Sequence, residues 1–239
     1  MNIDYAKGLT FAFDDKDWLS KLGKGALWAF ISMILVIPAW FFSTGYGLQT
    51  AKNVMRGEKH PLPNLDDIGS IFVDGLKFFL ASFVLLLPMI VLICIMMSGM
   101  IAAGTAADSL DEDTLGAIMG GSAIVVQCIA GLYGILIGFI MPALMVRYLQ
   151  TDGDIRETLN MGKLFAIVRE HFVPCLMILL MSFAASIAFQ FAFYLSFITI
   201  CGWIFVFFAG IPWLAAVQGH LVGQFASNLD NKMDGVESY

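Results

Sequence analysis

The sequence predicts an all-α integral membrane protein with four to five transmembrane helices, amphipathic interfacial helices and a re-entrant first hairpin. Of the 239 residues, 59% are hydrophobic and 13% are charged, whereas a soluble domain has about 45–50% apolar and about 25% charged residues. The chain also contains four long stretches without Asp, Glu, Lys or Arg. An unpaired charge at the bilayer centre costs roughly 3 kcal/mol, so such stretches are typical of membrane spans. We therefore expect residues 1–239 to form a single membrane domain.

The first uncharged stretch, residues 25–51, fits two topologies. It follows a charged N-terminal segment, 1–24, that we expect to lie at the membrane interface, and it is interrupted by Pro38. As a span it leaves the four lysines of the N-terminal segment outside the cell. As a re-entrant hairpin that turns at Pro38 it leaves all 13 Lys and Arg residues in the cytoplasm. We favour re-entry, which requires that protein surrounds the hairpin.

Four further spans follow from the other uncharged stretches. The last stretch, 172–229, is too long for one helix at about 1.5 Å per residue, so it must fold back near Thr199–Gly202. The predicted spans form two hairpins, 78–103 with 120–146 and 174–198 with 203–225.

Charged connections separate these hairpins and set their orientation. Apolar residues recur at helical spacing in 66–79 and 155–172, which predicts two amphipathic helices in the membrane interface. The loop 104–119 contains four acidic residues and no basic one. The positive-inside rule therefore places the basic loops and the C-terminal tail, 226–239, in the cytoplasm.

Similar segments recur along the chain and indicate an internal repeat. The exits of the three hairpins are similar, because Pro38 leads to Gln49, Pro142 to Gln150 and Pro212 to Gln218. The pattern fits three units of an interfacial helix plus a hairpin, of which the first is shortened. Chance matching among apolar residues is the alternative explanation.

The sequence contains no recognisable catalytic, cofactor or metal site. Its four cysteines lie in apolar stretches without Cys-x-x-Cys spacing, and its three histidines lack metal-ligand spacing. The acidic pairs Asp66–Asp67 and Asp152–Asp154 precede predicted helices, where N-capping explains them. The net charge of −6 argues against nucleic acid as a partner.

Small residues and intramembrane polar residues are the candidate functional positions. Three pairs of small residues at four-residue spacing predict helix packing: Gly134 with Gly138, Ala184 with Ala188, and Gly219 with Gly223. Four polar residues within the spans are the other candidates: Gln127, Gln190, Gln218 and His220.

The first third of the chain resembles a prokaryotic family of multi-spanning membrane proteins known only as a domain of unknown function. The segments that carry the resemblance are Gly45–Gly57, which ends in Arg-Gly, Leu62–Gly69, which contains Leu-Pro-x-x-Asp-Asp, and Phe72–Lys77. Asp4-Tyr5 and the acidic run before Trp18 fit as well. The resemblance implies a fold and a multi-pass protein of the prokaryotic inner (cytoplasmic) membrane, and no catalytic residues.

These observations favour a non-catalytic membrane protein that acts as a scaffold or accessory subunit of a larger assembly. Its expected partners are the lipid bilayer and other membrane subunits or further copies of itself. The alternative is a transporter or channel for a small or amphipathic solute, with a polar cavity lined by Gln127, Gln190 or Gln218. A lipid-modifying enzyme that uses His171 with Glu170 or Asp74 is the third hypothesis.

Overall fold

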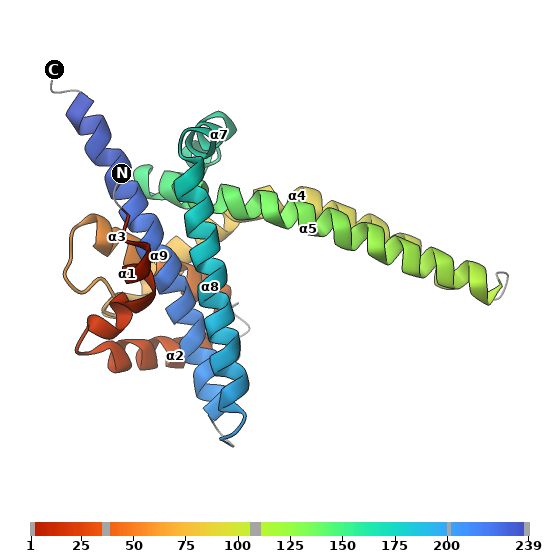
Figure 1. Ribbon diagram of the computed structural model, residues 1–239, viewed down its shortest axis with the longest axis horizontal. Helices are drawn as coiled ribbons and strands as arrows, with labels where there is room; N and C mark the ends of the chain where they lie inside the picture. Colours follow the sequence, from red (N-terminus) through yellow and green to blue (C-terminus); the bar gives the residue numbers. More distant parts are fainter. Residues whose placement is uncertain (1–2, 35–38, 106–110, 200–201, 237–239) are drawn as a thin grey trace. The chain divides into compact units, whose positions relative to one another are not determined.

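The computed structural model describes residues 3–34, 39–105, 111–199 and 202–236, and within these ranges all regular structure is helical. The chain divides into two compact units, and each is described by itself. Unit 1 comprises residues 1–81 and 140–239, and unit 2 comprises residues 82–139. The helices are α1 Tyr5–Thr10, the 3₁₀ helix η1 Phe11–Asp14, α2 Trp18–Ile34, α3 Ala39–Met55, α4 Ile68–Thr105, α5 Glu112–Gln150, α6 Ile155–Thr158, α7 Met161–Glu170, α8 Phe172–Ser196 and α9 Gly202–Val236 (Figure 1).

Four helices are long and apolar enough to cross a membrane, as the composition predicts. The candidate spans are Ile68–Ala102, Gly120–Gln150, Phe172–Ser196 and Gly202–Leu229. The chain is thus an all-helical, multi-pass membrane protein. The predicted reversal near Thr199–Gly202 lies between the end of α8 and the start of α9. The turn expected at Pro38 lies outside the described residues.

The two predicted interfacial segments differ in the structure. Residues 66–79 do not form a separate helix, because α4 runs without a break from Ile68 to Thr105 and includes Pro88. No glycine or proline occurs between Lys77 and Pro88 to end it. Residues 155–172 instead form the short α6 and then α7, which ends where His171 leaves the helical conformation with φ −122° and ψ 41°.

Two other boundaries also differ from the expectation. The segment 226–239, expected to be a tail, continues α9 as far as Val236. The span expected over 120–146 corresponds to the candidate span Gly120–Gln150, and the helix that contains it, α5, begins earlier, at Glu112. Its start is fixed by Asp111, whose carboxylate accepts hydrogen bonds from the Thr114 backbone N–H at 2.7 Å and from the Thr114 hydroxyl at 2.9 Å.

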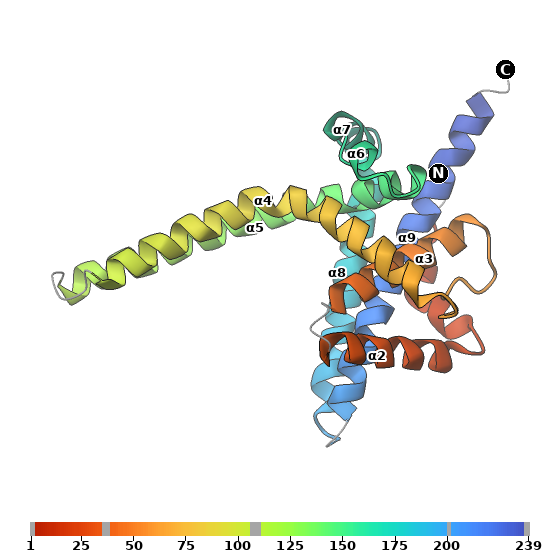
Figure 2. The same ribbon diagram turned by 180° about the vertical axis from the view of Figure 1, so that it is seen from behind.

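The core of unit 1 forms from the second helix of each hairpin. Burial begins close to Pro142 in α5 and to Pro212 in α9, and it also includes most of α3. Most of the largest fully buried side chains belong to these helices: Phe42, Tyr46 and Leu48 of α3, Leu144, Val146 and Tyr148 of α5, and Val217, Leu221 and Phe225 of α9. α8 lies beside α9, and α2 runs across α9 (Figures 1 and 2).

Unit 2 is an antiparallel hairpin made from the later part of α4 and the earlier part of α5. The two helices lie side by side (Figure 2), and the Tyr133 hydroxyl donates a hydrogen bond to the Leu85 carbonyl oxygen. Its apolar side chains are mostly exposed, for example Ile95 at 63% and Leu132 at 71%. This exposed surface is the kind that a bilayer or another membrane protein covers.

Candidate functional site

α3 and α9 cross in direct backbone contact in unit 1, and Gly219 and Gly223 lie at this crossing. A side-chain carbon on Gly219 would collide with the Gly47 carbonyl oxygen of α3, and one on Gly223 would lie 2.7 Å from the Ala51 carbonyl oxygen. In the other direction, a side-chain carbon on Gly47 would lie 2.6 Å from the Ala215 carbonyl oxygen. Small residues on both helices therefore allow the two backbones to approach directly.

A second close approach joins α3 to the first turns of α4. A side-chain carbon on Gly75 would collide with the Phe41 carbonyl oxygen, and one on Gly45 would collide with the carbonyl oxygen of Ile71. The packing pairs expected from the sequence do not include Gly45, Gly47 or Gly75. The signal that was available is Gly45-x-Gly47 in α3, which does not have the four-residue spacing of the known membrane motif.

The other small-residue pairs are not in contact of this kind. Nothing lies within 4 Å of a side-chain carbon placed on Gly134, and Gly138 is half-buried. Ala184 and Ala188 of α8 are both exposed, and the residue of α8 that is buried in this stretch is Ala185.

An open face of small residues follows α5 through unit 2. Its members recur every three or four residues and so share one side of the helix; they are Gly116, Gly120, Ala123, Gln127, Gly131, Gly134 and Gly138. All are exposed except Gly138, and the structure has nothing within 4 Å of a side-chain carbon placed on Gly116, Gly120, Gly131 or Gly134. We call this set the α5 glycine face. It is distinct from the side of α5 that carries Tyr133 toward α4.

Gln127 lies in the middle of the α5 glycine face. Its side chain is exposed, and it makes no hydrogen bond with another described residue. It therefore places an amide with both donors and an acceptor on a surface formed otherwise by apolar or small residues.

The remaining intramembrane glutamines do not converge on one site. Gln190 of α8 is exposed, and the neighbouring Phe189 lies against Gly210 of α9. Gln218 is half-buried and follows Gly210 by eight residues, or about 12 Å along a helix. The two amides thus lie at different levels of the α8–α9 pair.

His220 is buried in a polar contact between α9 and the N-terminal segment. Its side chain, 5% exposed, stacks on the Phe11 ring with centroids 4.2 Å apart, and its Nδ1 lies 3.1 Å from Nε2 of Gln224. Gln224 Oε1 accepts a hydrogen bond of 2.7 Å from the Asp4 backbone N–H. These contacts make His220 a structural residue that attaches the N-terminal segment to α9.

Two buried or half-buried ion pairs hold the charged segments of unit 1. Lys21 Nζ lies 2.8 Å from Asp15 Oδ2, and their side chains are 16% and 5% exposed. Lys52 Nζ of α3 lies 2.5 Å from Asp74 Oδ2 of α4, and the Tyr148 hydroxyl donates to Asp74 Oδ1 at 3.2 Å. Lysine and aspartate are rarely buried unless they are paired in this way.

The N-terminal segment contains the two perturbed titratable groups that bear on its packing. Burial opposes ionisation of Asp15, but hydrogen bonds from Lys21 and from the Asp17 backbone N–H, together with the Lys21 charge, hold its pKa below 3.8. Burial, and then the nearby Cys175 thiol, raise the pKa of Tyr5. Both shifts are explained by contacts within the fold.

The candidate catalytic and metal residues have structural explanations. The Asp154 carboxylate accepts from the backbone N–H groups of Arg156 and Glu157 at the start of α6, and Asp67 accepts from the Ser70 backbone N–H at 3.1 Å. The predicted N-capping is thus confirmed. His171 lies at the bend between α7 and α8, with its ring 5.8 Å from that of Phe225. Across the described residues, no group of three or more His, Cys, Asp or Glu residues is arranged to hold a metal ion.

Comparison with known families identifies the family to which the chain belongs. Residues 27–200 match the family described as Protein of unknown function (DUF4013). The chain belongs to the DUF4013 family. The matched region contains α3, α4, α5, α6, α7 and α8, together with residues 27–34 of α2, so it includes the glycines of α3 and the whole α5 glycine face. No curated protein and no solved structure matches the chain.

Proposed function

We propose that this DUF4013 protein is a non-catalytic scaffold or accessory subunit of a larger membrane assembly. The observation that carries the proposal is the α5 glycine face with Gln127 at its centre. In unit 1, the positions beside Gly45 and Gly47 of α3 and beside Gly219 and Gly223 of α9 are occupied by neighbouring backbone, whereas those beside Gly116, Gly120, Gly131 and Gly134 of the α5 glycine face are open. Such faces in membrane helices normally pack against another helix.

Gln127 adds a polar contribution to this expectation. An amide that faces hydrocarbon leaves its donors and acceptor unpaired, while an interhelical hydrogen bond within a membrane contributes about 0.6 kcal/mol, and up to about 1.7 kcal/mol. A partner helix that brings a polar side chain to this level would satisfy the amide. A second copy of the chain is suitable in principle, because two glutamine amides both donate and accept.

The proposal includes the location and orientation of the protein. We place it in the inner (cytoplasmic) membrane of a prokaryotic cell, with its basic loops and its C-terminus in the cytoplasm. The support is the charge distribution: the loop 104–119 contains no Lys or Arg, whereas basic residues occur in 46–77 and 147–171.

The alternative functions have less support from the geometry. A transporter needs polar groups that converge on a path, and Gln190 and Gln218 lie about 12 Å apart along the α8–α9 pair. A lipid-modifying enzyme needs free titratable groups near one another. Asp74 is instead engaged by Lys52 and Tyr148, and His171 lies against Phe225.

The proposal is tested by purification in a mild detergent, followed by mass determination and identification of co-purifying chains. We expect a stoichiometric partner or an oligomer that is larger than the single 26.2 kDa chain. The substitutions Gly120→Leu and Gln127→Leu should reduce the assembled fraction at least tenfold. Gly121→Leu is the matched control, because Gly121 is also exposed with nothing near its side-chain position but lies about 100° around the helix. A wild-type protein that is monomeric and free of partners contradicts the proposal.

A further inference from the structure

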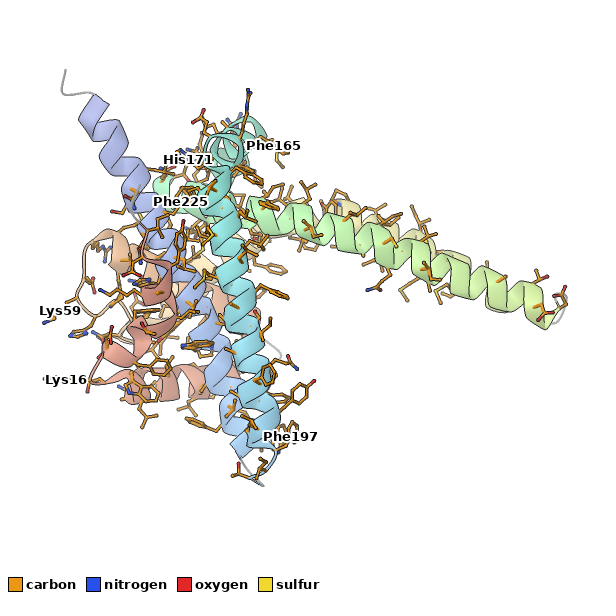
Figure 3. All side chains as sticks on the ribbon, viewed as in Figure 1. Lys16, Lys59, Phe165, His171, Phe197 and Phe225 are labelled. Atoms are coloured by element: carbon orange, nitrogen blue, oxygen red, sulfur yellow. The ribbon has the colours of Figure 1, made fainter. Side chains whose placement is uncertain are left out.

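Contacts with α9 show at which level along this helix the described residues up to Met55 lie. At one end of the α8–α9 pair, the rings of Phe197 and Trp203 stack with centroids 5.9 Å apart. Toward the other end, His171 and Phe225 make an edge contact at 5.8 Å. Figure 3 shows Phe197 and Phe225 well separated along the pair. We call these the turn end and the Phe225 end of α9.

The N-terminal segment begins at the Phe225 end. Asp4 donates its backbone N–H to Gln224 at 2.7 Å, and Phe11 stacks on His220. Between them, a side-chain carbon on Gly8 would lie 2.5 Å from a methyl group of Leu221. The three contacts follow α9 from residue 224 to residue 220.

α2 meets α9 at a level nearer to the turn end. A side-chain carbon on Gly25 would lie 3.3 Å from Pro212, and the ring of Phe30 meets that of Phe208 at 5.1 Å. Between Gln224 and Phe208, α9 advances 16 residues, or about 24 Å. The chain has therefore moved most of the thickness of a bilayer core, about 30 Å, away from its starting level.

α3 returns to the Phe225 end. Its Gly47 lies against Ala215, and further along, Ala51 and Val54 lie against Gly223 at 2.7 Å and 2.9 Å from the position of its side-chain carbon. Residue numbers thus increase together on the two helices, so α3 and α9 run in the same direction. α3 ends beside Gly223, one residue from the level at which Asp4 meets Gln224.

We infer that residues 3–34 and 39–55 are the two limbs of a re-entrant hairpin that enters and leaves the membrane on the same side as the C-terminal end of α9. A segment that crossed the bilayer once would place Asp4 and Val54 beside opposite ends of α9. Both residues lie beside the same end. The required protein surroundings are present, because α9 is in contact with α1, η1, α2 and α3. The pairing of Lys21 with Asp15 neutralises the most buried charges of this segment.

The inference assigns a common side of the membrane to three separate surfaces. The N-terminal segment, the loop 56–67 and α6–α7 then all lie on the side of the Phe225 end, since His171 joins α7 to that end. The number of complete crossings becomes four, and all 13 Lys and Arg residues lie on one side. This result does not depend on the proposed function.

The test is labelling of single cysteines with a membrane-impermeant maleimide in right-side-out and inverted membrane vesicles. The four native cysteines are replaced, and Lys7→Cys, Glu58→Cys, Lys163→Cys or Ile198→Cys is introduced one at a time; all four positions are exposed. We expect the first three to react in the same type of vesicle. Ile198, at the turn end, is the control and should react in the opposite type. Reaction of Lys7→Cys and Glu58→Cys in opposite types of vesicle would overturn the inference.

A second measurement avoids replacement of the native cysteines. The otherwise wild-type chain carries an epitope tag at its N-terminus and a protease site inserted after Glu58, which is exposed. We expect the tag and the site to be cleaved by added protease in the same type of vesicle and both to be protected in the other type. Cleavage of the two in different vesicles contradicts a re-entrant hairpin.

Discussion

The glycines of α9 and those of α5 have opposite surroundings although both occur in membrane helices. Gly219 and Gly223 meet the backbone of α3, whereas Gly120 and Gly134 have open space at the same position. The first pair connects helices within one chain. The second pair leaves a helix face that nothing in its own unit fills. The comparison teaches that glycines in a membrane helix do not by themselves tell whether their face is filled within the same chain.

The largest effect should come from Gly219→Leu. The new side chain has no room, because even its first carbon collides with the Gly47 carbonyl oxygen, and backbone cannot move aside as a flexible side chain can. We expect a loss of stability of about 3 kcal/mol or more, seen as aggregation or a strongly lowered thermal midpoint in detergent. Gly121→Leu, where space is open, should keep the wild-type midpoint. Equal thermal midpoints for Gly219→Leu and Gly121→Leu would contradict the distinction between glycines that meet backbone and glycines in open space.

A smaller effect is expected for Asp15→Asn, which removes the ion pair between Asp15 and Lys21 within the N-terminal segment. The substitution leaves the Lys21 ammonium without its carboxylate partner at a site where its side chain is only 16% exposed. A hydrogen bond to a charged group contributes about 2 kcal/mol, and the free energy of unfolding at neutral pH should fall by about that amount. Asp17→Asn is the control, since Asp17 is exposed. A variant as stable as wild type would show that this pair does not hold the segment.

The same pair predicts a pH dependence. The pKa of Asp15 is lower in the folded protein than its ordinary value of 3.8, so the ionised form is favoured by folding. This contribution is present in full above the unfolded pKa and is lost as the pH falls from about 4 through the folded pKa. We expect wild-type unfolding, followed by tryptophan fluorescence in detergent, to become easier over this range, and Asp15→Asn to lose that part of the slope. An identical acid profile in both proteins contradicts the assignment.

The smallest effect on folding is expected at the α5 glycine face. Gly120→Leu adds a side chain to open space and replaces the residue with the lowest helix propensity after proline, so the isolated chain should be unchanged or stabilised by up to about 1 kcal/mol. Thermal unfolding of the monomeric protein in a strong detergent measures this change in stability. A large destabilisation would show that the glycine face is already covered within the chain.

Much of the architecture can be predicted from the distribution of charge. Uncharged stretches locate all four candidate spans and the reversal between α8 and α9, because charges are excluded from hydrocarbon. Helix N-capping by Asp67 and Asp154 also follows from sequence, since this preference acts over only three residues.

Other features depend on distant contacts that no local pattern reveals. The attachment of Asp4 to Gln224 joins residues 220 positions apart. Gly47 and Gly75 lie against the backbone of other helices. Their spacing within their own helices does not predict these contacts. The expected break near residue 79 is absent because nothing there interrupts the helical hydrogen bonds of α4. Among the candidate residues, His220 belongs to the core, while Gln127 and Gln190 are exposed.

Cysteine cross-linking in native membranes tests most directly whether another protein chain covers the α5 glycine face. In a chain without its native cysteines, Gly120→Cys, Gly134→Cys and the control Gly121→Cys are oxidised or treated with a short thiol cross-linker before any detergent is added. We predict cross-linked products that contain a second chain for Gly120→Cys and Gly134→Cys and not for Gly121→Cys. Absence of products at all three positions, or equal yields at all three, would contradict the view that this face packs against a partner.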